Sequence, residues 1–168
     1  MARSFSITFY RAAYGDPYPD EYIKQLARDL RPQDKADLEA ACFDAEFAIR
    51  QSIAFSDVVY IYLDDRGRCI SMLGLGNLEC SSLGRSIWSV SANEINKGYV
   101  KTLLWKQAKM VIEMWADTYG LLQNVVNIEN KTSIHYMEKV LGAVFLPESI
   151  EANGHTWRAF YILGKGGK

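Results

Sequence analysis

The chain has 168 residues, a length that fits one domain able to bury roughly 70% of its unfolded surface. Hydrophobic residues at 49% and charged residues at 23% argue against both disorder and a membrane protein. A net charge of -1, without a basic block, argues against nucleic-acid binding through phosphate neutralisation. Because no apolar run reaches about 18 residues and the N-terminus lacks an apolar core, we expect neither a membrane span nor a signal peptide.

The first third of the chain predicts one strand followed by helices. Residues 4–10 alternate apolar and polar side chains, which is typical of a strand with one buried face. Asp20 can cap a helix that Pro32 limits from beyond its end. A second helical region runs from residue 33 to about 41 and resumes after Asp44, and its spacing fits either one bent helix or two helices.

Three strands follow, and the first two form a predicted hairpin. Residues 58–63 are the most β-prone run, and residues 64–67 supply turn chemistry before a second strand at 69–75. A third strand is expected at 86–91. The chain has three cysteines, Cys42, Cys69 and Cys80, whose spacing fits neither a zinc site nor a redox pair. We therefore interpret them as reduced, buried thiols and expect no metal site.

Residues 99–145 are predicted to form a long helix, a buried strand and a shorter helix, and we expect any ligand to lie at this unit. The long helix carries an apolar stripe from Val100 to Tyr119 and ends at Gly120. The strand from Leu121 to Ile128 is short and β-branched. The second helix ends at Gly142.

The last part of the chain predicts a strand near Ile150, a tight turn at Asn153 and Gly154, and a strand at 156–163. The order is therefore β-α-α-β-β-β-α-β-α-β-β in a single domain, residues 1–163, with a flexible tail at 164–168. We expect an α/β (α+β) fold with a mixed, twisted sheet and helices on both faces, because short turns join the central strands while a crossover helix precedes the Leu121 strand.

This order resembles the GCN5-related N-acetyltransferase (GNAT) fold over the whole chain. The most telling local match is Asn130 followed by a helix that leads into residues 139–145 and its Gly142. A narrower match over roughly residues 26–145 rests on a set of scattered positions: Leu26, Ala27, Leu30, Arg31, Asp34, Ile87, Trp88, Leu122, Asn124, Val126, Asn130 and the ending at 142–145. Over these positions the chain resembles small GNAT-like proteins of short-tailed, podovirus-type phages. Some of those are classed as internal virion proteins that enter the host with the DNA, and others as a domain of unknown function.

The resemblance implies acetyl-CoA or CoA as cofactor, but the cofactor loop departs from the family pattern. In active members the loop reads Arg or Gln, two residues, Gly, one residue, then Gly or Ala, so that backbone N-H groups cradle the pyrophosphate. Here Ile95 and Val100 replace the first and last determinants. The cofactor-binding residues that the resemblance implies are Ser91, Asn96, Lys97, Gly98, Tyr99, Lys101 and Asn130.

The expected catalytic groups also differ from the family pattern. A Tyr four residues before the helix-ending Gly often protonates the departing thiolate, and this position holds Glu138, with Tyr136 two residues earlier. The candidates for a base that deprotonates the amine are Glu79 and Glu94, which flank the third strand.

Two functions remain open from the sequence. The first is a phage GNAT-like protein in the virion or the host cytoplasm, with a degenerate cofactor loop and a phage or host protein as partner. The second is an active acetyl-CoA-dependent N-acetyltransferase that modifies a host protein or a small amine.

Overall fold

A computed structural model describes residues 8–13, 20–76, 84–96 and 98–166. The predicted order is confirmed, and the region after Pro32 is two helices, α2 and α3. In chain order the elements are β1 (Thr8–Ala13), α1 (Asp20–Asp29), α2 (Pro32–Ala40), α3 (Ala45–Ala54), β2 (Ser56–Leu63), β3 (Cys69–Gly76), β4 (Arg85–Ser91), the 3-10 turn η1 (Asn93–Asn96), α4 (Gly98–Tyr119), β5 (Leu121–Asn127), α5 (Lys131–Lys139), β6 (Val144–Ala152) and β7 (His155–Leu163).

A sharp break separates α2 from α3. Cys42 adopts a left-handed φ of 61°, which ends α2. Asp44 then caps α3, since its carboxylate accepts a hydrogen bond from the N-H of Phe47 at 3.0 Å. This break leaves Cys42 exposed, so the prediction of a buried thiol is wrong there and right for Cys69; Cys80 lies outside the described residues.

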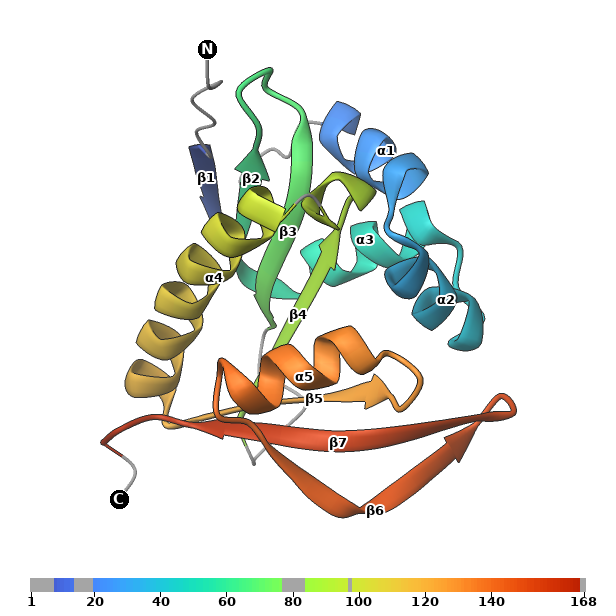
Figure 1. Cartoon of the computed structure of the whole chain (residues 1–168), viewed down its shortest axis with the longest axis vertical. Helices are drawn as coiled ribbons and strands as arrows, with labels where there is room; N and C mark the ends of the chain where they lie inside the picture. The colour runs from blue at the N-terminus through green and yellow to red at the C-terminus, as the bar shows by residue number, and fades with distance from the viewer. Residues whose placement is uncertain (1–7, 14–19, 77–83, 97, 167–168) are drawn as a thin grey trace.

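The seven strands form one mixed sheet in the order β1-β2-β3-β4-β5-β7-β6. Only the β4–β5 pair is parallel among the described strands, as expected after the crossover helix α4. Figure 1 shows the sheet opening into two parts at this pair: β2, β3 and β4 run along the long axis, and β5, β7 and β6 run across it.

Helices cover both faces of the sheet, because β2 has apolar side chains on both of its faces. Val58, Tyr60 and Tyr62 pack in the core beneath α4, whereas Val59 and Ile61 pack in the core beneath α1 and α3. A strand buried on both faces needs apolar residues throughout, which is the continuous run that the sequence shows. α4 and α5 therefore lie on one face, and α1 and α3 on the other (Figure 1).

Two further expectations about burial need correction, one in α4 and one in β5. Tyr119, assigned to the buried stripe of α4, is exposed and lies under the Arg85 guanidinium, 4.6 Å from the ring centroid. Val125, expected to be buried, is exposed because it borders the cavity described below. Residues 4–7 of the first predicted strand lie outside the described part of the chain.

The expected tail at 164–168 is tethered at its start. The N-H of Gly164 donates to the carbonyl of Gly120 at 3.0 Å, and the N-H of Lys165 donates to the carboxylate of Asp117 at 2.7 Å. Within the four described ranges, none of the helices combines the length and apolarity needed to cross a bilayer.

Candidate functional site

The opening between β4 and β5 organises the site. The two strands pair only at their first residues, Arg85 with Leu122 and Ser86 with Gln123. One step further, the Asn124 side-chain amide donates to the carbonyl of Ile87. Beyond that point the strands separate, and a gap opens in the middle of the sheet (Figure 1).

β4 presents main-chain hydrogen-bonding groups to this gap. The N-H of Ala92 donates to the carbonyl of Ile70 at 2.9 Å, which fixes the alternation of the β3–β4 ladder. By that alternation Ile87, Ser89 and Ser91 direct their main-chain groups away from β3. The carbonyl of Ile87 accepts from the Asn124 side chain of β5. The N-H of Ser91 donates to Asp34 of α2, and its carbonyl accepts from the N-H of Arg31, the residue just before α2. Ser89, between them, directs its N-H and C=O into the gap.

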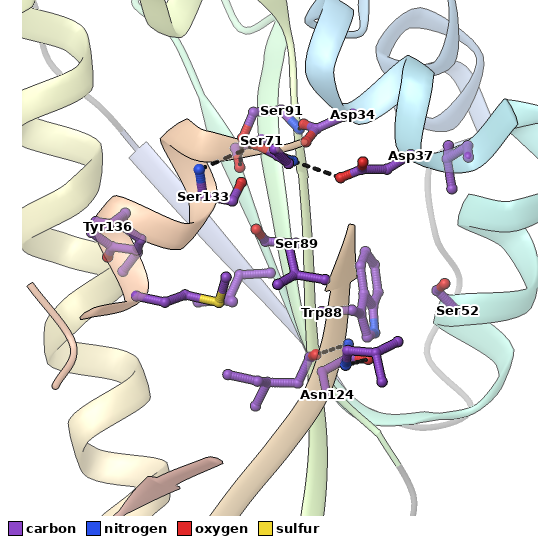
Figure 2. Close-up of a pocket in the computed structure, with 18 of the residues that line it drawn as sticks. Asp34, Asp37, Ser52, Ser71, Trp88, Ser89, Ser91, Asn124, Ser133 and Tyr136 are labelled. Atoms are coloured by element: carbon purple, nitrogen blue, oxygen red, sulfur yellow. Dashed lines mark hydrogen bonds between the residues drawn. The ribbon is translucent and has the colours of Figure 1, made fainter. Parts of the chain in front are cut away.

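A cavity of about 610 Å³ passes through the sheet at this opening. One side is lined from α2 and α3, and the other from α4 and α5, which lie on the opposite face. Figure 2 shows Ser89 between the two sides, with Ser52 and Asp37 on one and Tyr136 and Ser133 on the other. A ligand in the gap can therefore be reached from both faces of the sheet.

A buried ion pair holds the upper corner of the cavity. The Arg31 guanidinium donates to both carboxylate oxygens of Asp34, at 2.8 and 2.7 Å, and to the Ser133 hydroxyl at 3.0 Å. Asp34 also accepts the N-H of Ser91 at 2.7 Å. Both charged side chains are buried, and each charge has its partner. The pair therefore joins α2, β4 and α5 at the end of the gap.

Asp37, one turn after Asp34, is a different kind of carboxylate. It is half-buried, lines the cavity and accepts a hydrogen bond from the Asn130 amide at 2.6 Å (Figure 2). No salt bridge joins it to a basic side chain within the described ranges. Burial raises the pKa of Asp37 to about 6, with Asp34 and Glu129 adding to the rise and the Asn130 bond and Arg31 opposing it. Such a group is poised to exchange protons near neutral pH.

Asp37→Asn is expected to stabilise the fold at pH 8 relative to wild type and to leave stability unchanged at pH 3.5. The folded-state pKa of about 6 exceeds the ordinary value of 3.8, so the native state binds the proton more tightly and stability falls as pH rises through that window. The asparagine carbonyl can still accept from Asn130. Thermal unfolding at both pH values measures the difference, and an equal loss at both would contradict it.

Tyr136, rather than Glu138, faces the cavity from α5. The Tyr136 hydroxyl donates to the carbonyl of Trp105 at 3.1 Å, and the two rings lie 4.6 Å apart between centroids. Burial raises the pKa of Tyr136, so its hydroxyl keeps its proton at neutral pH. Glu138, the other candidate acid, does not line the cavity and is exposed to solvent, because positions two apart differ by about 200° around a helix.

The two candidate bases do not reach this site as far as the structure describes them. Glu94 lies in η1, where its carboxylate is 3.5 Å from the Arg68 guanidinium, and it does not line the cavity. Glu79 lies outside the described residues, as does Lys97.

The predicted cofactor residues divide into two groups. Ser91 and Asn130 line the cavity, where the side-chain amide oxygen of Asn130 caps α5 by accepting from the N-H of Ser133 at 3.1 Å. Four others lie at or just before the start of α4, outside the cavity lining: Asn96, Gly98, Tyr99 and Lys101. Lys101 places its ammonium 4.4 Å from the centroid of the Trp105 ring.

The apolar substitutions in the predicted cofactor loop have a packing explanation. Ile95 and Val100 are both 2% exposed and belong to the core beneath α4. Val100 therefore points inward and does not cover the N-terminus of its helix, while a Cβ built on Gly98 meets no atom within 4 Å. Among the described residues, therefore, none closes the helix N-terminus to an anion in spite of the altered motif.

The sequence interpretation missed Asp37, Ser89 and three cavity-lining phenylalanines in and beside α3, Phe43, Phe47 and Phe55. Asp34 and Asp37 are three residues apart on one helix face, a spacing that would have placed them together. Ser89 had no side-chain signal, since its contribution is the backbone.

The chain is similar to solved structures, whereas no family model and no curated protein matches it. An acyl-CoA N-acyltransferase from Pseudomonas aeruginosa has a TM-score of 0.64 at 12% identity, covering 94% of this chain and 99% of that one. An acetyltransferase of the GNAT family from Streptococcus pneumoniae gives 0.58 at 11% identity, over 95% and 99% of the two chains. Spermidine N-acetyltransferase from Vibrio cholerae, in complex with CoA and spermine, gives 0.59 at 13% identity, over 92% and 95%. The chain thus has the GNAT fold.

Proposed function

We propose that the protein is an acyl-CoA-dependent N-acyltransferase that acetylates a primary amine, either a small molecule or a group on a host protein. The observation that carries the proposal is the gap between β4 and β5, into which Ser89 directs its N-H and C=O. Acetyl-CoA supplies an acyl group activated as a thioester. The N-H of Ser89 can donate to the thioester oxygen as negative charge develops there, and its C=O can accept from an amide N-H of the pantetheine arm.

Two other parts of the site fit this cofactor. The open N-terminus of α4, with Lys101 in its first turns, offers backbone N-H groups and a positive charge to phosphates. Tyr136 offers a protonated hydroxyl on the cavity side from which α4 and α5 approach, where it can give a proton to a departing thiolate. These placements support Tyr136, rather than Glu138, as the acid.

The second candidate is a GNAT-like protein without catalysis, with the phage-virion or host-directed binding role that the sequence resemblance implies. The observation in its favour is the loop in which Gly98 alone matches the family pattern, together with a solvent-exposed Glu138 at the usual acid position. In that case a partner protein, rather than a cofactor, would be the relevant ligand.

Acetyl transfer to an amine separates the two candidates. The protein is incubated with labelled acetyl-CoA and, in parallel, with spermidine, with a panel of monoamines and with host lysate, and free thiol and labelled product are measured. Transfer with stoichiometric thiol release is expected. Absence of transfer to every acceptor at high protein concentration would support the binding role instead.

A further inference from the structure

Three exposed phenylalanines form a rim on the α2–α3 side of the cavity. Phe43, Phe47 and Phe55 are 51%, 51% and 68% exposed, and all three line the cavity. The Phe43 and Phe47 ring centroids lie 6.4 Å apart. Ile49 and Ile53 are buried on the opposite face of α3, so the core does not explain the exposed aromatic side chains of Phe47 within the helix, Phe43 just before it and Phe55 just after it.

A fixed tryptophan continues this aromatic surface into the gap. Trp88 of β4 lines the cavity next to Ser89, and its ring N-H donates to the Ser56 hydroxyl at 2.8 Å. Its ring lies so close to β3 that a Cβ on Gly74 would fall 2.2 Å from it. The indole is therefore held in one place. An aromatic or apolar group entering from the α2–α3 side meets rigid aromatic walls.

One carboxylate in the described lining of the cavity has no counter-charge there. The lining contains three charged side chains among the described residues, and Arg31 and Asp34 neutralise each other. Asp37 is the remaining one. One uncompensated carboxylate matches one ammonium group, whereas a polyamine would bring additional positive charges that this lining does not balance.

We propose that the α2–α3 side of the cavity binds a primary amine bearing one aromatic group, whose ring packs on the rim of Phe43, Phe47 and Phe55 and whose ammonium meets Asp37. This inference rests on the proposed acyltransferase function. Figure 2 shows the carboxylate of Asp37 and the ring of Tyr136 on opposite sides of Ser89, so base and acid flank the reacting centre.

The proton and bond changes balance in this arrangement. Asp37 takes one proton from the ammonium, and the free amine nitrogen forms the new C-N bond as the C-S bond breaks. Tyr136 gives a proton to the departing thiolate. The acylated nitrogen then gives up its extra proton, which returns to the Tyr136 oxygen. One net proton then passes from Asp37 to solvent. The charged groups near Asp37 are Arg31, Asp34 and Glu129.

The test measures amine binding and acetyl transfer separately. The amine 2-phenylethylamine is titrated calorimetrically into the whole protein at pH 8 without cofactor, and kcat/KM is then compared for 2-phenylethylamine and 1,4-diaminobutane with acetyl-CoA. Saturable binding and at least a roughly ten-fold preference for the aromatic amine are expected. Phe47→Ala with Phe55→Ala should weaken binding of the aromatic amine roughly 10- to 100-fold and remove the preference. Met110→Ala with Met114→Ala, an exposed apolar pair on α4, is the matched control.

Asp37→Asn tests the proposed role of Asp37 as the group that binds and deprotonates the ammonium. The variant should lower kcat by roughly 10²- to 10⁴-fold and abolish the rise of kcat/KM through about pH 6 that is expected of wild type. Asp65→Asn, in the exposed β2–β3 turn, is the control. Equal or better use of the diamine, with CoA bound, would overturn the aromatic-amine inference alone. Absence of saturable 2-phenylethylamine binding would overturn the aromatic-amine inference whether or not CoA binds. If the amine binds and CoA does not, only the acyltransferase function is overturned.

Discussion

Asp34→Ala is expected to lower the free energy of unfolding by about 3–5 kcal/mol, because it leaves the Arg31 guanidinium buried without its counter-charge. The same change removes the acceptor for the N-H of Ser91. Arg31 and Asp34 are 8% and 5% exposed, so water cannot replace the lost partner without opening the corner between α2, β4 and α5. Urea unfolding followed by circular dichroism measures the loss.

The matched control for this variant is Glu39→Ala. Glu39 lies in the same helix and faces Lys35 at 3.9 Å, but both side chains are exposed, and such surface pairs contribute little. A similar loss in the two variants would show that the buried pair has no special role in holding the end of β4.

Tyr136→Phe is expected to lower kcat by roughly 10²- to 10⁴-fold while CoA binding stays nearly unchanged. The phenyl ring can still pack on Trp105, so the change keeps the aromatic contact and removes only the hydroxyl, together with its hydrogen bond to the Trp105 carbonyl. Because burial raises the pKa of Tyr136, the wild-type acid stays protonated through neutral and mildly alkaline pH. Steady-state thiol release and a calorimetric CoA titration measure the two quantities.

The control for the tyrosine variant is Tyr119→Phe. Tyr119 lies in α4 but is exposed at its end, under Arg85. If kcat of Tyr136→Phe stays within about two-fold of wild type, Tyr136 is a packing residue and the proton must come from elsewhere.

Local patterns predicted most of the fold because each of them has a local physical cause. The Asn153-Gly154 turn is one example, since both residues adopt positive φ, 54° and 74°, as a tight hairpin requires. Gly120 and Gly142 end their helices in the same conformation, at 82° and 67°. The choice between one bent helix and two could not be made, since it depended on the left-handed backbone at Cys42, a residue that rarely adopts it.

The site was harder to predict because its parts meet only in the folded chain. The four-residue count back from Gly142 selected Glu138, but the face that α5 turns to the cavity is set by its packing, which brings Tyr136 inward. Val100 departs from the small residue of the family's cofactor loop, but its side chain is buried in the core and so does not cover the start of α4. Ser89 contributes backbone groups whose direction follows from strand pairing, which no single residue type reports.

Calorimetric titration with CoA tests the central claim most directly, and Ser89 supplies the matched variants. Wild type is expected to bind one CoA with a dissociation constant on the order of 1–100 µM. Ser89→Pro, which removes an N-H that makes no bond to β3, should weaken binding at least roughly ten-fold with the fold retained, whereas Ser89→Ala keeps that N-H and should bind CoA like wild type. Absence of a saturable signal from wild type up to about millimolar CoA would contradict an acyl-CoA site between β4 and β5.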